Sequence, residues 1–179
     1  MIELVHAIII LGACAIVLTS WRYEKITGIS PSPLLPWVRA RLIKILRQEM
    51  DPDKTYQIVD LGAGWGGMTA TLAWYFPNTK IQGYEISPWP WILSCFQALP
   101  YGRRVRIIRQ DFFKADLNKY DVIICYLSPS HMQDLRKTFE KLRKGKVIIS
   151  AAFPVPGWAP AKAEKVRGPV AINIYLYKT

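Results

Sequence analysis

Cysteine, histidine and acidic residues are scarce in this chain of 179 residues, which holds three Cys, two His and 13 Asp and Glu residues. Cys14, Cys95 and Cys125 lie far apart and are odd in number, which excludes a disulfide scaffold. The sequence has no Cys-x-x-Cys pair and no Cys/His spacing of a zinc site, so we expect no bound metal. Such cysteine usage indicates a reduced, intracellular setting.

Acidic residues are most outnumbered in the C-terminal part of the chain. The whole chain has 24 Lys and Arg residues and a formal net charge of +11, and residues 101–179 alone contain 16 basic and six acidic groups. Such a surface favours an anionic partner, either a nucleic acid or the negative cytoplasmic leaflet of a membrane. The alternative is a solvated face that only aids solubility.

The N-terminus has no Lys or Arg before residue 22, and a signal peptide would begin with one. The apolar run from Leu4 to Trp21 is interrupted by a single titratable group, His6. A helix of that length measures about 27 Å, close to the roughly 30 Å hydrocarbon core of a bilayer. We therefore predict an uncleaved transmembrane anchor over residues 1–21, in preference to a signal peptide or a buried core helix.

Basic residues follow this apolar run and none precedes it, so the positive-inside rule predicts a single-pass membrane protein whose domain faces the cytoplasm. Residues 22–50 form the predicted linker and amphipathic helix. The linker, extended over residues 22–33, contains the proline-punctuated segment 28–36, which cannot be continuous helix. Residues 34–50 show apolar side chains at helical spacing, typical of a helix that lies on a membrane or caps the next domain.

From residue 56 onward the pattern alternates between strands and helices. The apolar runs predict strands at 56–61, 80–86, 105–109, 121–127, 146–152 and 170–177, and helices at about 66–76, 89–99 and 130–143. This alternation predicts an α/β domain over residues 51–179, with a Rossmann-like, mostly parallel sheet. The segment before residue 170 leaves no room for a helix, so we expect a C-terminal antiparallel hairpin.

A glycine-rich loop follows the first predicted strand, in the sequence Asp60-Leu-Gly62-Ala63-Gly64-Trp-Gly-Gly. Glycines let backbone N–H groups approach a ligand closely, with a helix N-terminus behind them. The spacing also fits a dinucleotide fingerprint. However, the Asp60 anion suits an amine-bearing ligand better than a pyrophosphate, so Asp60 and the terminal hairpin favour S-adenosylmethionine.

Two further strands end in carboxylates. Glu85, between Tyr84 and Ile86, can accept both hydroxyls of a ribose. Asp111 and Phe112 follow the third strand, where a carboxylate can bind the adenine amino group and a ring can cover its face; Asp111 also suits a helix cap and Phe112 the core. The predicted cofactor-binding residues are Asp60, Gly62, Ala63, Gly64, Tyr84, Glu85, Ile86, Asp111 and Phe112.

These motifs resemble the seven-strand class I methyltransferases. More narrowly, four segments resemble the membrane-anchored protein-lysine methyltransferases that act on ATP synthase c-subunit and adenine nucleotide translocase. These segments are Gly83-Tyr-Glu-Ile-Ser-Pro-Trp89, Asp111-Phe-Phe-Lys114, Pro129-Ser-His-Met132 and Phe153-Pro-Val-Pro-Gly-Trp-Ala-Pro160. The resemblance implies methyl transfer from S-adenosylmethionine to a lysine of a protein, expected to be membrane-embedded. It also implies contact with the membrane through the N-terminal helix and the basic surface.

Methyl transfer from a sulfonium chiefly requires that the two reactants be bound and aligned. The candidates for positioning the incoming amine are Tyr126, Ser128, Pro129, His131 and Trp158. His131 can also accept a proton or serve a structural role, and Trp158 either walls the lysine channel or packs on the sheet. The main alternative function is methylation of RNA or another nucleic acid, which the predicted anchor disfavours. A nicotinamide oxidoreductase and a non-enzymatic binding module are further alternatives.

Overall fold

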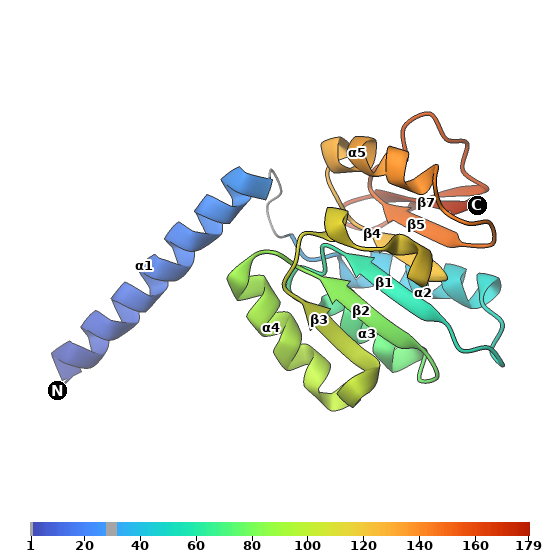
Figure 1. Cartoon of the computed structure of the whole chain (residues 1–179). Helices are drawn as coiled ribbons and strands as arrows, with labels where there is room; N and C mark the ends of the chain where they lie inside the picture. Colours follow the sequence, from blue (N-terminus) through green and yellow to red (C-terminus); the bar gives the residue numbers. More distant parts are fainter. Residues whose placement is uncertain (1, 28–31) are drawn as a thin grey trace. The chain divides into compact units, whose positions relative to one another are not determined.

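The computed structural model describes residues 2–27 and 32–179, which belong to two compact units, residues 1–31 and residues 32–179 (Figure 1). The first unit contains one helix, α1 (Ile2–Thr27). The predicted extended linker beginning at residue 22 is therefore wrong as far as Thr27, because residues 22–27 contain neither Pro nor Gly to end the helix. The next part of that linker, residues 28–31, lies outside the described residues.

The predicted anchor was based on the length and apolar character of the run from Leu4 to Trp21. Over residues 2–27 and 32–179, no helix is long and apolar enough to cross a membrane. The predicted transmembrane helix over residues 1–21 is thus not supported.

The second unit is built on a seven-stranded sheet with the order β3-β2-β1-β4-β5-β7-β6. The strands are β1 (Gln57–Leu61), β2 (Lys80–Tyr84), β3 (Val105–Ile108), β4 (Val122–Cys125), β5 (Val147–Ala151), β6 (Lys162–Val166) and β7 (Ile172–Lys178). The first five strands pair in parallel, whereas β7 runs antiparallel to both β5 and β6. The predicted Rossmann-like sheet and its C-terminal hairpin are confirmed. The first strand of that hairpin, β6, is short and was not among the predicted strands.

The apolar side chains of one sheet face pack against the helix that precedes β1 and the helices that follow β1 and β2. These are α2 (Pro36–Glu49), α3 (Gly67–Tyr75) and α4 (Pro88–Ala98). Val38, Leu42 and Leu46 of α2 are fully buried and share a core with Leu72 and Ile81. Of the two roles considered for this helix, the structure shows the capping role, because its apolar side faces the domain core.

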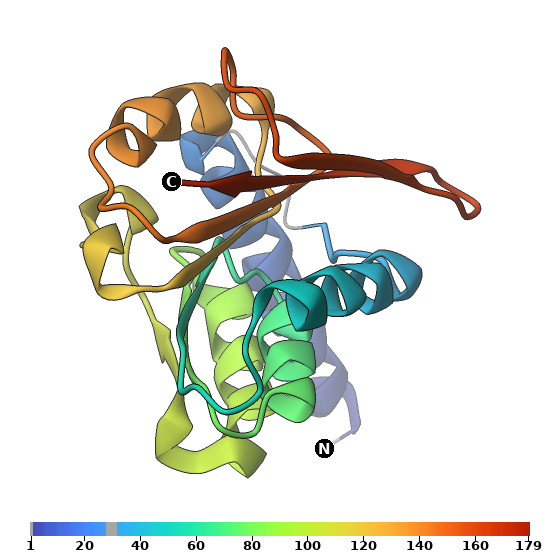
Figure 2. The ribbon, with the colours of Figure 1, turned by 90° about the vertical axis from the view of Figure 1, so that its right-hand side faces the viewer.

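The second unit therefore begins at residue 32, not at the predicted boundary of 51. A two-pronged ion pair fixes α2 to the C-terminal hairpin: Arg41 donates from Nε and an Nη to the two oxygens of Glu164, at 2.5 and 2.6 Å. Figure 2 shows the β6–β7 hairpin running alongside α2. Helix and hairpin thus close one end of the sheet together.

The opposite sheet face carries one α-helix, α5 (Pro129–Phe139), among the residues that the structure describes. Helix α5 ends earlier than the predicted residue 143, where the chain turns tightly toward Gly145 at φ +87°. Between β3 and β4 the described chain forms only the short 3-10 helices η2 (Phe112–Lys114) and η3 (Leu117–Lys119). A third one, η1 (Leu99–Arg104), follows α4. The loops at the carboxyl ends of β3 and β4 therefore face each other without a covering helix.

Candidate functional site

The glycine loop leaves β1 in a backbone conformation that only glycine adopts readily. Gly62 and Gly64 have φ values of +74° and +54°, in the left-handed region. A Cβ atom on Gly62 would lie 2.9 Å from Cδ2 of Leu127, the residue two positions after β4. The loop therefore lies directly beside the exit of β4, at the edge of the sheet where open α/β folds bind ligands.

Asp60 is a buried carboxylate on β1, just before this loop. Its Oδ2 accepts a hydrogen bond of 2.7 Å from the Thr69 hydroxyl on α3. Burial raises the pKa of Asp60 to about 6; the Thr69 hydrogen bond opposes this rise, and the neighbouring Glu85 charge adds to it. A carboxylate that is costly to ionise in place gains most from a cationic ligand group, which is what the sequence analysis expected at this position.

Glu85 lies at the end of β2 and connects the glycine loop to the start of α4. Its Oε2 accepts the backbone N–H of Gly64 at 2.9 Å, and its Oε1 accepts that of Ser87 at 2.7 Å. Each carboxylate oxygen keeps a second lone pair, so the group can still accept from two hydroxyls. The geometry fits the predicted role toward a ribose.

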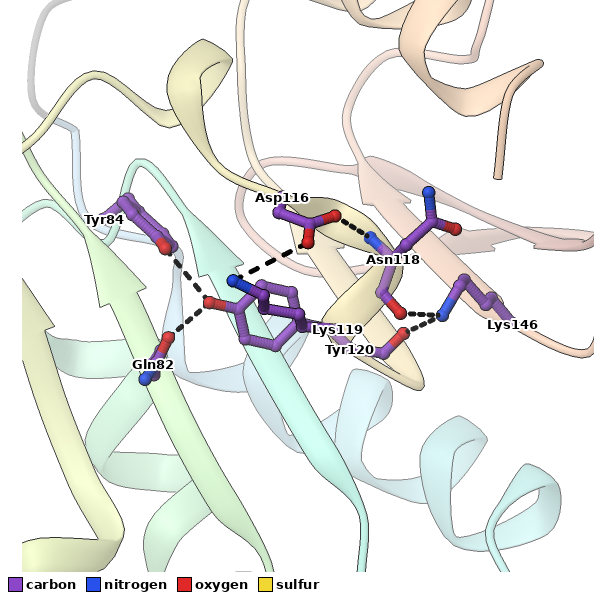
Figure 3. A network of polar contacts seen from close by, with 7 residues as sticks. All are labelled: Gln82, Tyr84, Asp116, Asn118, Lys119, Tyr120 and Lys146. Carbon is purple, nitrogen blue, oxygen red and sulfur yellow. Dashed lines mark hydrogen bonds and ion pairs between the residues drawn. The ribbon is translucent and has the colours of Figure 1, made fainter. Parts of the chain in front are cut away.

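The two neighbours of Glu85 in the sequence, Tyr84 and Ile86, differ in their contacts and burial. The Tyr84 hydroxyl lies 3.0 Å from that of Tyr120, which also donates to the Gln82 side chain, so the Tyr84 ring is engaged in the polar network of Figure 3. Its carbonyl accepts the N–H of Ala63 at 2.8 Å and ties β2 to the glycine loop. Ile86 is half-buried beside Glu85. Tyr84 and Ala63 thus shape the site through their backbone.

The same network reaches the opposite end of the sheet. The Lys146 ammonium is buried and donates to the carbonyls of Asn118 and Tyr120, at 2.9 and 2.6 Å. These bonds fix the segment that positions the Tyr120 ring under Tyr84 (Figure 3). Through Tyr120, the network holds the side chains of Gln82 and Tyr84 near the C-terminal end of β2.

Asp111 and Phe112 follow β3, at the third of the adjacent strand ends. Asp111 caps η2 by accepting the N–H of Phe113 at 3.0 Å, so the capping role considered from the sequence is observed. The half-buried Phe112 ring lies 4.6 Å from Phe113 and 5.9 Å from His131, between ring centroids. This contact brings the β3 end and the β4 end together.

The loop after β4 positions the predicted amine-orienting residues. Ser128 Oγ lies 2.6 Å from Nδ1 of His131 and 2.9 Å from Ser130 Oγ, while Pro129 starts α5. Tyr126 is half-buried and packs against the core. Burial lowers the pKa of His131 below its usual 6.5, although the charges of Asp134 and Asp111 oppose this. This lowered pKa favours the neutral imidazole.

Phe113 is a member of this cluster that sequence reasoning missed. Its exposed ring stacks on His131, with centroids 5.9 Å apart and planes inclined by 19°. The only local signal was the Phe112-Phe113 pair, and the contact itself depends on the spatial proximity of the β3 and β4 ends.

Trp158 lies apart from these residues in the contacts it makes. Its ring packs against Phe139 of α5 and Tyr177 of β7, at centroid distances of 6.3 and 6.0 Å. The buried Tyr177 hydroxyl in turn accepts the N–H of Val155 at 2.9 Å. Of the two roles considered for Trp158, packing on the sheet is the one that these contacts show.

The donors and acceptors present fit S-adenosylmethionine. Asp60, Glu85 and Asp111 follow or end three adjacent strands, β1, β2 and β3. The buried Asp60 has a second oxygen for an amino group, Glu85 has acceptors for a diol, and Asp111 lies next to an aromatic ring. Two carboxylates beside the glycine loop disfavour the pyrophosphate of a dinucleotide.

Known proteins are similar to this chain in sequence and in fold. The chain is 28% identical to a protein-lysine N-methyltransferase of Saccharolobus islandicus over 75% of this chain and 88% of that protein. It is 28% identical to the adenine nucleotide translocase lysine N-methyltransferase of Mus musculus over 83% of this chain and 68% of that protein. An RNA methyltransferase of Salinibacter ruber, solved in complex with S-adenosyl-L-homocysteine, superposes with a TM-score of 0.71 at 27% identity and covers 82% of this chain and 93% of its own.

The match to a family model includes all three strand-end carboxylates and the loop after β4. It extends over residues 60–162, more than half of the chain, and ends within β6. Together with the strand order and the glycine loop, this match shows that the chain belongs to the family of the ANTKMT methyltransferase domain, and so is a methyltransferase.

Proposed function

We propose that this methyltransferase transfers a methyl group from S-adenosylmethionine to the side-chain nitrogen of a lysine in a protein. The observation that carries the proposal is the contact between the two sides of the site: the Asp111–Phe113 turn at the cofactor side touches His131 of the α5 start. The Saccharolobus and mouse relatives, both named as lysine N-methyltransferases, support lysine as the acceptor.

The cofactor supplies an activated methyl group on a sulfonium, so the protein has to bind, align and desolvate the reactants. Asp60 would hold the amino group, Glu85 the ribose and Asp111 the adenine, while the glycine loop provides backbone N–H groups. Phe112 and Phe113 would flank the route of the acceptor, because their rings lie between the Asp111 turn and His131.

A lysine must lose its proton before it can attack, and its ordinary pKa is about 10.4. The lowered pKa of His131 favours its neutral form, and Ser128 holds the ring through Nδ1. If Nδ1–H donates to Ser128, the Nε2 lone pair is available to accept the lysine proton. We assign this role to His131 and the role of fixing its tautomer to Ser128. Aromatic walls and the positive sulfonium also lower the pKa of an entering ammonium.

We further propose that the acceptor lysine belongs to a membrane protein and that α1 brings the domain to the cytoplasmic side of the membrane. Large apolar side chains of α1 are exposed, among them Ile2, Leu4, Val17 and Leu18. Basic residues follow this apolar part of the helix, as at Arg22 and Lys25. The mouse relative, named for the adenine nucleotide translocase, further supports a target of this class.

RNA methylation is the second candidate, favoured by the Salinibacter structure and by the 16 basic residues of the segment 101–179. One labelling experiment separates the two. The full chain is incubated with methyl-labelled S-adenosylmethionine and, in parallel, with membranes, a soluble protein extract or total RNA. We expect label in membrane proteins. Label confined to RNA would replace the first proposal with the second, and label in soluble proteins alone would remove the membrane target.

A further inference from the structure

Large apolar side chains are exposed on two neighbouring helices of the domain, away from the candidate site. Trp74 at the end of α3 is 73% exposed, and Phe96 and Leu99 on and after α4 are 63% and 70% exposed. Tyr75, Ile92 and Leu93 are exposed as well. We name these six residues the α3–α4 face. Soluble domains rarely expose so many large apolar groups on one surface unless the surface binds something.

The exposed side chains of α4 form a stripe and are not scattered. Ile92, Phe96 and Leu99 follow one another at intervals of four and three residues, which places them on one side of a helix. Ser94, on a different side, is buried against α3, since a Cβ atom on Gly66 would lie 2.7 Å from its Cα. The core thus takes one side of α4, and the outward side carries the apolar stripe.

The two helices contribute to a continuous surface at their C-terminal ends. Trp74 and Tyr75 of α3 line the same open cleft, of about 280 Å³, as Gln97 of α4 and Tyr101 of η1. Figure 1 shows α4 beside the edge strand β3. Gln97 and Tyr101 thus connect the aromatic end of α3 to the part of the chain that carries the α4 stripe.

The charge around this face has one sign. From residue 62 to residue 110 the chain contains a single acidic residue, Glu85, which is buried. The same stretch contains five basic residues, of which Arg103 directly follows the α4 stripe and is exposed. Two more guanidinium groups lie over aromatic rings of the cleft: Arg47 over Tyr75 and Arg104 over Tyr101, at 5.1 and 5.2 Å.

We propose that the α3–α4 face docks onto an anionic lipid membrane. Aromatic and aliphatic side chains next to basic ones, in a stretch (residues 62–110) without an exposed carboxylate, match the apolar boundary and negative headgroups of such a surface. A second copy of this chain is a poorer occupant, because the two faces would bring cations against cations. This contact is separate from α1 and does not depend on the identity of the methyl acceptor.

Vesicle binding of residues 32–179 tests the proposal, since this unit has its own core and lacks α1. Vesicles of phosphatidylcholine with phosphatidylserine are compared with phosphatidylcholine alone in a co-sedimentation assay. We expect binding to the anionic vesicles only, weakened by added salt, and a loss of at least tenfold in the double variant Phe96→Ser/Leu99→Ser. Arg103→Glu should weaken binding at low salt without removing any apolar group.

Val170→Ser is the matched control, because Val170 is 57% exposed between β6 and β7, at the other edge of the sheet. It should bind like the unaltered domain, and circular dichroism with S-adenosylhomocysteine binding verifies that every variant is folded. Absence of binding to anionic vesicles would overturn the proposal, as would equal losses in the Val170→Ser control. A domain dimer that the double variant dissociates, without vesicle binding, would assign the face to self-association instead.

Discussion

The carboxylate of Glu85 accepts the backbone N–H of Gly64 at 2.9 Å, which connects the end of β2 to the glycine loop after β1. The same carboxylate accepts the N–H of Ser87 at the start of α4. One side chain therefore fixes the two segments that flank the proposed ribose position, and it keeps acceptors for the ligand. Its removal is expected to affect binding by both routes.

Glu85→Ala should weaken S-adenosylhomocysteine binding about 10- to 150-fold, since hydrogen bonds to charged groups contribute roughly 1.5–3 kcal/mol. Isothermal titration calorimetry measures the affinity. Glu140→Ala is the control, because Glu140 lies exposed in a surface pair with Arg136. Unchanged affinity in Glu85→Ala would contradict the assigned position of the ribose.

The buried Asp60 predicts a dependence of stability on pH. Its pKa in the folded protein is about 6, above the usual 3.8 of an aspartate, so the folded state holds this proton more tightly than the unfolded state. The stabilisation is complete below pH 3.8 and is lost as the pH rises through about 6. The difference is about 3 kcal/mol, from 1.36 kcal/mol per pKa unit. Urea unfolding of Asp60→Asn from pH 4 to 8 should lack this component; an unchanged pH profile would contradict it.

Cofactor binding should show the complementary effect. An amino group of the ligand favours ionised Asp60, so affinity for S-adenosylhomocysteine should fall as the pH drops below about 6. Calorimetry in buffers of different ionisation enthalpy should show proton release on binding near pH 6. Asp60→Asn should bind more weakly and without this pH dependence. Proton uptake in the unaltered protein would refute the pairing.

His131 is expected to act in the transfer step and not in cofactor binding. His131→Ala should lower kcat about 100-fold or more, the typical contribution of a proton-transfer group, with S-adenosylhomocysteine affinity nearly unchanged. Because the neutral imidazole is the active form and its pKa is lowered, kcat should fall only as the pH drops below 6.5. That acidic limb should vanish in His131→Ala. A full-rate variant, or an unaltered limb, would leave His131 a structural residue.

Trp158 should matter for stability. The half-buried ring packs against Phe139 and Tyr177. Trp158→Ala should therefore destabilise the domain by about 2 kcal/mol, less than the 3–5 kcal/mol of a fully buried aromatic residue. Chemical unfolding measures the loss, and the more conservative Trp158→Phe should recover most of it. Normal stability with a large fall in kcat would instead restore its role as a wall of the lysine channel.

Local sequence patterns were sufficient for most of the fold. The runs Val122-Ile-Ile-Cys125 and Val147-Ile-Ile149 are rich in β-branched residues and largely buried on both faces, as central parallel strands require. The sheet and hairpin were predicted correctly because strands, glycine loop and helices alternate along the chain. Strand β6 was missed because Lys162-Ala-Glu-Lys-Val166 has little apolar pattern, and it is held by pairing with β7 and by the contact between Arg41 and Glu164.

The positions of the candidate carboxylates at strand ends were predictable from the sequence. Asp60 and Glu85 lie where parallel strands finish, and the sequence places both there. The stacking of Phe113 on His131 was not predictable, and the sequence left two roles open for Trp158, since each depends on contacts between distant segments. The α2 helix is similar: its apolar spacing fits either a membrane or a core, and only the folded chain shows that it covers the sheet.

Mass spectrometry of the methylated product tests the central proposal most directly. The full chain, with S-adenosylmethionine carrying a labelled methyl group, is incubated with membranes and RNA together, and the products are digested to amino acids and nucleosides. We predict labelled N-methyl-lysine, formed in proportion to S-adenosylhomocysteine and strongly reduced by Glu85→Ala. Labelled methyl nucleosides without labelled methyl-lysine would contradict the proposal that a protein lysine is the acceptor.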